Sequence, residues 1–224
     1  LDSGDIAYLS RKARKMLDEA GWKNCTITVS NSLDEYLIQD LWMQDAKIDA
    51  FGVGERLITA KSEPVFGCVY KLVAVEDKDG NIVPKIKISE NVGKITTPHF
   101  KKLYRFYGRD TGKAIADYLT VYDETVDDSK NLEIFDPDAT WKRKEVYHFE
   151  ARELLVPIYQ KGKLVYKRPS VEEIKKYCAE QVDTLWDEVK RFDNPHNYYV
   201  DLSQKLYDIK TRLLNEKNER REQN

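Results

Sequence analysis

The chain has 224 residues, of which 41% are hydrophobic and 34% are charged, so it can bury a sizeable core as one large or two small domains. Its 37 basic and 39 acidic residues give a formal charge of -2, which argues against the strongly basic surface that dominates nucleic-acid affinity. Three scattered cysteines and the lack of any run of about 20 apolar residues exclude a disulfide framework, a zinc site and a membrane helix. We expect a globular cytoplasmic protein with reduced thiols that binds neither nucleic acid nor membrane.

A helix is predicted over residues 6–20, because apolar residues recur there at steps of three and four. Gly21 follows at the position of a C-terminal glycine cap. Residues 25–29 alternate polar with apolar side chains and are rich in β-branched residues, which predicts a strand.

A second helix is predicted after Ser32, which stands three residues before Glu35 in the spacing of a capping box. The next short strand is expected at residues 48–51. This order of loop, helix and strand is typical of βα repeats in a parallel sheet or barrel, and therefore of an α/β fold. The buried stripe of the second helix consists of Leu33, Leu37 and Leu41.

After residue 59 the sequence becomes β-rich, which predicts a mixed α+β region. We place the domain boundary between residues 64 and 65, with the α/β repeats in 1–64 and the mixed α+β domain in 65–224. The acidic stretch 123–144 is expected to be an exposed connection. The predicted hairpins join residues 66–76 to 82–89, 102–107 to 115–122, and 153–159 to 163–166.

Two C-terminal helices are predicted. Ser170 and Glu173 form a second capping box that opens a long helix to about Arg191, and a final helix begins near Leu202. The first of these helices is expected to be buried through Ile174, Cys178, Val182, Leu185 and Val189.

Three loops follow strands, or the place where a strand is expected, and should therefore lie on one rim. The carboxyl ends of parallel strands are where such folds place their ligands. The loops are Asp2-Ser3-Gly4-Asp5, Ser30-Asn31-Ser32 and Gly52-Val53-Gly54.

Gly52 and Gly54 interrupt the chain directly after the second strand. Glycines let the backbone approach a ligand closely, and the N–H groups that follow can point at an anion such as phosphate. A tight turn with no ligand explains the same pattern, so both interpretations stay open.

Asp2 and Asp5 bring two carboxylates to one turn, where they could bind sugar hydroxyls or hold Mg²⁺ that bridges to pyrophosphate. Alternatively, either Asp caps the following helix. Ser30 and Asn31 could donate to a sugar hydroxyl or a phosphate, although both residue types are also common before helices. The three histidines are His99, His148 and His196. None stands beside a nucleophile or in a metal-ligand pair, so we expect each of them to be structural or solvent-exposed.

The three loops, in this order and spacing, resemble the second half of a bacterial nicotinate phosphoribosyltransferase. Residues 1–5 resemble that family's Arg-x-Asp-Ser-Gly-Asp segment without its Arg. The similarity covers nearly the whole chain. The remaining matches are Ser30-Asn31-Ser32-Leu33-Asp34-Glu35, Phe51-Gly52-Val53-Gly54, Val69-Tyr70-Lys71-Leu72, Lys87-Ile88-Ser89-Glu90 and the Pro-Ser-x-Glu-Glu motif at Pro169 to Glu173.

The resemblance implies the C-terminal part of an irregular α/β barrel followed by a mixed domain with two C-terminal helices, in an enzyme that is usually a homodimer. The family condenses nicotinate with phosphoribosyl pyrophosphate to nicotinate mononucleotide and pyrophosphate, and couples this step of NAD biosynthesis to ATP hydrolysis. Mg²⁺ is the implied cofactor and ATP a co-substrate.

Roles for individual residues follow from the resemblance. Asp2 would hold ribose hydroxyls, and Asp5 would lie near pyrophosphate and Mg²⁺. The N–H groups of Gly54 and Glu55 would bind the 5′-phosphate. The full set of expected substrate-binding residues is Asp2, Ser3, Asp5, Ser30, Asn31, Gly52, Val53, Gly54 and Glu55.

The sequence departs from the family in two respects. No His here matches the context of the family's phosphorylated catalytic histidine, so we expect that residue in a missing N-terminal half, and no catalytic residue in this chain. Glu55 stands where the family commonly has Thr, which puts a carboxylate near the proposed phosphate. We therefore expect a fragment that is inactive alone.

Two alternatives remain. A nicotinamide phosphoribosyltransferase would share the phosphate and ribose loops, since the base is selected elsewhere. A non-catalytic phosphate-ligand module would share the rim but no reaction.

Overall fold

The computed structural model describes residues 1–222, together with their side chains except those of Val92 and residues 217–222. Its contacts divide the chain into two compact units, Leu1–Val69 and Tyr70 onward. The expected mixed α/β composition is confirmed, since the described residues form five α-helices and several small sheets.

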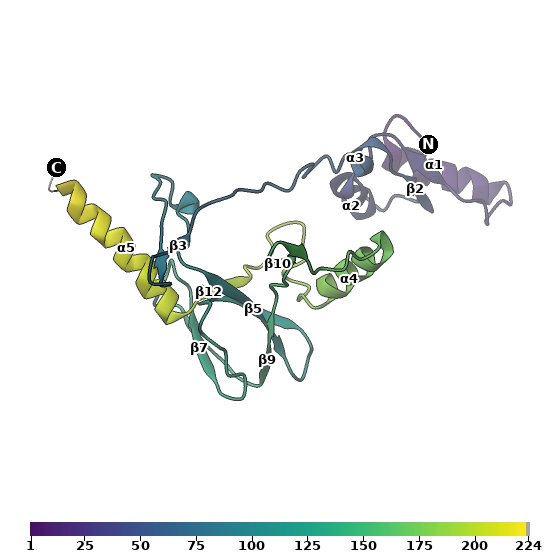
Figure 1. The fold of residues 1–224 in the computed structure, drawn as a ribbon. Helices are drawn as coiled ribbons and strands as arrows, with labels where there is room; N and C mark the ends of the chain where they lie inside the picture. Colours follow the sequence, from purple (N-terminus) through teal and green to yellow (C-terminus); the bar gives the residue numbers. More distant parts are fainter. Residues whose placement is uncertain (223–224) are drawn as a thin grey trace. The chain divides into compact units, whose positions relative to one another are not determined.

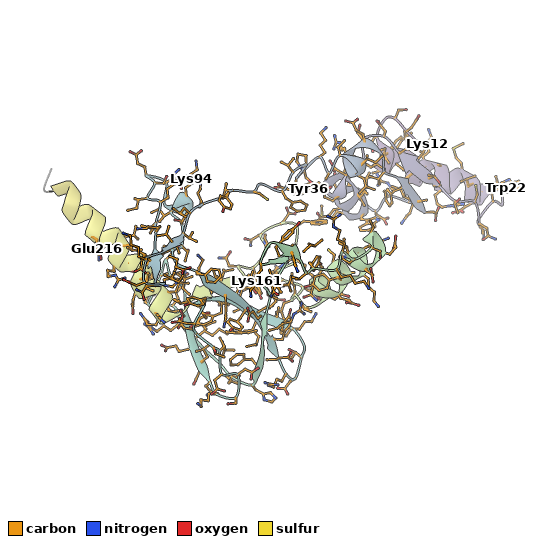
Figure 2. All side chains as sticks on the ribbon, in the orientation of Figure 1. Lys12, Trp22, Tyr36, Lys94, Lys161 and Glu216 are labelled. Atoms are coloured by element: carbon orange, nitrogen blue, oxygen red, sulfur yellow. The ribbon has the colours of Figure 1, made fainter. Side chains whose placement is uncertain are left out.

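The first unit alternates helices and strands in the predicted order (Figure 1). Asp5 caps its first helix by accepting the N–H of Tyr8 at 2.9 Å. Gly21 follows that helix with φ +86°, a left-handed conformation that glycine adopts without a Cβ clash. The exposed Trp22 comes next (Figure 2). The elements are α1 (Ile6–Glu19), β1 (Thr28–Ser30), α2 (Glu35–Met43), β2 (Ala50–Gly52) and α3 (Glu55–Ile58).

The two strands of this unit form a parallel pair in which Thr28 faces Ala50 and Ser30 faces Gly52. Leu1 extends the pairing on the other side of β1: its N-terminus donates to the carbonyl of Thr28 at 2.8 Å, and its carbonyl accepts the N–H of Ser30 at 2.9 Å. Leu1 and β2 therefore lie on opposite sides of β1, and the loops that follow the three segments all begin at the same edge of the pairing.

The helices cover these strands with apolar side chains. Leu41 of α2 is buried and Leu37 packs against the same core, as predicted, whereas the buried Leu33 precedes the helix instead of belonging to it. The buried core of the unit consists of Ile6, Ala7, Ile27, Val29, Leu33 and Leu41.

The predicted capping box at Ser32 is wrong. Helix α2 begins at Glu35, and its N-cap is Asp34, whose carboxylate accepts the N–H of Leu37 at 2.9 Å. Asp34 has the extended backbone that an N-cap needs, whereas Ser32 has φ +50° and bonds only to Asn31.

The second unit is built on a four-stranded sheet with the order β12-β6-β5-β9. β5 pairs antiparallel with both β6 and β9, and β12 adds in parallel beside β6. Helix α5 (Gln204–Glu222) begins next to β12, where Leu206 packs on Val121 and Leu202 (Figure 1). The strands are β5 (Lys101–Gly108), β6 (Ala114–Val121), β9 (Phe149–Glu153) and β12 (Tyr199–Leu202).

Small hairpins and one 3-10 turn flank this sheet. The hairpins pair β3 (Ala74–Glu76) with β4 (Ile82–Pro84), β7 (Leu132–Phe135) with β8 (Arg143–Val146), and β10 (Tyr159–Gln160) with β11 (Lys163–Leu164), and the turn is η1 (Val92–Lys94). The core beneath the sheet contains Tyr104, Phe106, Ala116, Tyr118, Ile134, Val146 and Phe149.

Two predictions for the second unit are wrong, and one strand was not predicted. Residues 123–144 are not simply an exposed connection, because they contain β7 and the start of β8, and Ile134 is fully buried. The final helix begins at Gln204, close to its predicted start, but the residues before it form the parallel strand β12, which was not predicted. Helix α4 (Val171–Asp183) has its predicted capping box but ends before Thr184 and contains no buried residue.

Candidate functional site

The first loop of the candidate site, residues 2–5, leaves the parallel pairing at Leu1 and turns into α1. Gly4 makes this turn with φ +78°, and a Cβ there would lie 3.0 Å from Leu9 Cδ1. Asp5 Oδ1 caps α1, so the capping interpretation holds for that oxygen, while Oδ2 accepts no bond from the described residues. Asp2 and Ser3 are exposed beside it.

The second loop follows β1. Asn31 and Ser32 have φ +93° and +50°, so this loop doubles back in a conformation that Asn tolerates better than most residues. Both residues are exposed, and the Ser32 hydroxyl donates to Asn31 Oδ1 at 3.4 Å. Because neither caps α2, their exposed polar groups are not used at the start of that helix.

The third loop follows β2 and approaches the second closely. A Cβ at Gly52 would lie 3.3 Å from the Cβ of Ser30, so any larger residue would push the two loops apart by a few tenths of an ångström. Gly54 is the N-cap of α3 and has no side chain to satisfy the helix's first N–H groups. Within the described residues, the N–H groups of Gly54 and Glu55 donate to no carbonyl or side chain. Glu55 itself is exposed.

Arg56 is a site residue that the sequence reasoning missed. Its guanidinium pairs through Nη1 with Asp34 Oδ2, and both side chains are half-buried. The N–H of Leu37, and then the guanidinium of Arg56, hold the pKa of Asp34 below its usual value. Arg56 stands two residues after Gly54, but that position alone does not reveal its pairing with Asp34, 22 residues earlier in the chain.

A hollow of about 380 Å³ lies between the first loop, the second loop and the helices that follow them. It brings together the predicted Asp5 and Asn31. The other predicted residues, namely Asp2, Ser3, Ser30, Gly52, Val53, Gly54 and Glu55, flank it on the same edge without lining it. Its lining consists of Gly4, Asp5, Ile6, Ala7, Asn31, Ser32, Leu37, Leu41, Gln44 and Arg56.

The histidines lie in the second unit and take no part in this hollow. His99 is buried, and its Nδ1 accepts the N–H of Phe100 at 2.9 Å. His148 pairs with Asp110 at 3.1 Å, and His196 is exposed. These surroundings match the structural or solvent-exposed roles expected from the sequence.

Neither a cluster of metal ligands nor a membrane-spanning helix occurs among the described residues. No group of three or more His, Cys, Asp or Glu side chains is arranged to hold a metal ion by itself. None of the helices in the same residues has the length and apolar character that a bilayer crossing requires.

Comparison with known proteins identifies relatives of the whole chain. Residues 100–210 match the family described as the nicotinate phosphoribosyltransferase C-terminal domain. The chain is 45% identical to the nicotinate phosphoribosyltransferase of Bacillus subtilis, over 96% of this chain and 46% of that protein. It is 36% identical to nicotinate phosphoribosyltransferase 2 of Arabidopsis thaliana, over 93% of this chain and 38% of that one. The chain thus spans less than half the length of these relatives.

The fold also resembles solved structures. Human nicotinic acid phosphoribosyltransferase superimposes with a TM-score of 0.65 at 24% identity, covering 95% of this chain and 39% of that one. The nicotinate-nucleotide pyrophosphorylase of Pyrococcus furiosus superimposes with a TM-score of 0.53, also at 24% identity, covering 82% of this chain and 39% of that one.

Proposed function

We propose that this chain, which matches the nicotinate phosphoribosyltransferase C-terminal domain over residues 100–210 and resembles the Bacillus subtilis enzyme over 96% of its length, forms the sugar-phosphate side of a phosphoribosyl-transfer site. The reaction is the transfer of the phosphoribosyl group from phosphoribosyl pyrophosphate to nicotinate. Its products are nicotinate mononucleotide, on the route to NAD, and pyrophosphate, and the transfer is coupled to ATP hydrolysis.

The observation that carries this proposal is the meeting of three loops on one edge of the parallel strands. Ser30 and Gly52 are register partners, and Leu1 pairs with the other side of β1, so the loops that follow all three segments converge. Ligands of open parallel sheets and of α/β barrels occupy this edge. We also propose that these strands form the C-terminal part of an irregular α/β barrel.

Phosphate binding is assigned to the third loop. The N–H groups of Gly54 and Glu55 have no partner among the described residues and suit the 5′-phosphate. Ser30 and Asn31 face the same phosphate and its ribose, and Asp2 accepts from the ribose hydroxyls.

The chemistry is a displacement at the ribose C1, where an oxocarbenium-like centre forms as pyrophosphate leaves. This chain contributes by positioning the sugar and by offsetting the charge of the phosphate groups. Asp5 has one carboxylate oxygen left after capping α1, which fits Mg²⁺ held by a single carboxylate together with substrate phosphate oxygens. The ion would then neutralise the leaving group when bound.

The remaining parts of the reaction are assigned outside this chain. The groups that select the base and accept the ATP phosphoryl group, including a phosphohistidine, belong to the part of the relatives that the chain does not span. The working enzyme is a cytoplasmic homodimer in this proposal, and the chain alone is inactive. A nicotinamide-specific enzyme with the same loops is the second candidate, and a non-catalytic phosphate-ligand module is the third.

Two measurements on the full chain test the proposal. Incubation with nicotinate, phosphoribosyl pyrophosphate and MgATP should yield no nicotinate mononucleotide, whereas ³¹P NMR should show line broadening of phosphoribosyl pyrophosphate on addition of the chain. Clear product formation would refute the claim that the chain alone is inactive. Unchanged ³¹P lines at millimolar protein would refute the sugar-phosphate site.

A further inference from the structure

We propose that Arg56 is the cationic ligand for the anion in the hollow, and that Asp34 is the residue that positions it. This assignment rests on the proposed function, because the hollow lies on the same edge as the third loop, to which that function assigns the phosphate. The expected ligand is a phosphate monoester or a pyrophosphate ester of a sugar.

The charges around the hollow point to Arg56 as the partner of the anion. Of the side chains that line it, only Arg56 is cationic, whereas Asp5 is a carboxylate and the adjacent Glu55 adds another at the start of α3. A phosphate ester carries close to two negative charges at neutral pH. Backbone N–H groups alone would have to hold it against these carboxylates, so a guanidinium in the lining is the available counter-charge.

Asp34 fixes the guanidinium in place. Its Oδ1 is held by the N–H of Leu37 in the first turn of α2, and its Oδ2 pairs with Nη1 of Arg56. The carboxylate is therefore immobilised by one helix while it binds a side chain from another segment. Both side chains are half-buried, at 21% and 31% exposure, where such a pair is less screened than on an open surface.

The pair leaves most of the guanidinium unused. Arginine has five N–H donors, and among the described residues only Asp34 accepts one from Arg56. The free donors can form the two parallel bonds with which arginine binds phosphate oxygens. Because Asp34 binds Nη1 of the planar guanidinium, the remaining N–H donors of Arg56 already have a fixed orientation before the anion binds.

Asp34→Asn separates a positioning role from simple electrostatics. Asn caps helices about as well as Asp, so α2 should keep its cap and the thermal midpoint should stay close to that of the wild type. Removing a carboxylate near an anion would by itself tighten binding. If Asp34 positions Arg56, binding should weaken instead.

The experiment is calorimetry with ribose 5-phosphate and with phosphoribosyl pyrophosphate on the full chain. We expect Arg56→Gln to weaken both by about tenfold or more, the loss typical of a charge-assisted pair. Arg56→Lys should retain part of the affinity, and Asp34→Asn should weaken binding several-fold. Lys15→Gln is the matched control: it removes one positive charge from an exposed site on α1 and should change the affinity less than twofold.

The outcomes distinguish this assignment from the proposed function. If the wild type binds and Arg56→Gln binds equally well, Arg56 is not a ligand, although the phosphate site stands. Tighter binding by Asp34→Asn would refute the positioning role. If the wild type binds neither compound, the proposed function fails and this assignment fails with it. Should Arg56→Gln not fold, as circular dichroism would show, Arg56→Lys and Asp34→Asn decide the question by the same criteria.

Discussion

Ser30 and Gly52 face each other at the carboxyl ends of β1 and β2, and a Cβ on Gly52 would come within 3.3 Å of the Cβ of Ser30. A contact that short would be tighter than nine in ten real Cβ contacts. The absence of a Cβ at Gly52 therefore lets the second and third loops lie side by side on the edge where Asn31 and Gly54 lie.

Gly52→Ala should therefore disturb both the first unit and its site. Overpacking of a tight contact costs about 1 kcal/mol or more, and the loops must separate by a few tenths of an ångström. We expect a lower thermal midpoint and several-fold weaker binding of phosphoribosyl pyrophosphate. Gly67→Ala is the matched control, because a Cβ at Gly67 meets no atom within 4 Å. Equal behaviour of the two variants in melting and calorimetry would show that the contact is unimportant.

The start of α2 gives a second prediction. Asp34→Ala should lower the thermal midpoint by a few degrees, because it removes both the N-cap and the partner of Arg56. Ser32→Ala should leave the midpoint unchanged, since Ser32 caps nothing. Melting curves followed by circular dichroism test this, and a larger loss in Ser32→Ala than in Asp34→Ala would restore the capping box predicted from the sequence.

Asp201 in β12 makes the stability of the second unit depend on pH. The residue is 3% exposed, and burial, together with the neighbouring carboxylate of Asp136, raises the pKa of Asp201 to about 6, although Lys144 opposes the shift. Because the folded state holds the proton more tightly than the unfolded state, stability should fall as the pH rises from about 4 to about 6.

Asp201→Asn should remove this dependence and stabilise the unit above pH 6 by up to about 3 kcal/mol. Urea unfolding at several pH values measures the effect. Asp208→Asn, at an exposed position of α5, serves as the control and should leave the dependence in place. If Asp201→Asn destabilises the chain equally at pH 4 and pH 7, the raised pKa has no part in its stability.

The parallel arrangement of the first unit could be predicted from local patterns. Short stretches of sequence carry the periodicity of α1, the strand-type residues of β1 and the glycines at the end of β2. Because each loop follows a strand of a parallel pairing, the meeting of the loops on one edge could be predicted from the same stretches. Ser32 was misassigned because two competing caps stand close together, and only the backbone conformation shows that Asp34 is the one in use.

The errors in the second unit have a different origin. β12 joins the sheet by pairing in parallel with β6, more than 70 residues earlier in the chain, and no local pattern indicates that partner. β7 could not be recognised within the acidic stretch 123–144, because its Glu133 is exposed and resembles the residues of a loop, although Ile134 is buried. Arg56 was missed for a similar reason: its role becomes visible only when Asp34, 22 residues earlier, is placed beside it.

Calorimetry with phosphoribosyl pyrophosphate on the full chain and on Gly54→Asp tests the central claim most directly. No atom lies within 4 Å of a Cβ at Gly54, so an Asp side chain has room, but its carboxylate would stand where the phosphate is expected. Gly54→Asn, nearly identical in size but neutral, is the control. We predict binding by the wild type, a weaker interaction for Gly54→Asn and none for Gly54→Asp. Equal affinity of all three proteins, or no binding by the wild type, would contradict a phosphate site on this rim.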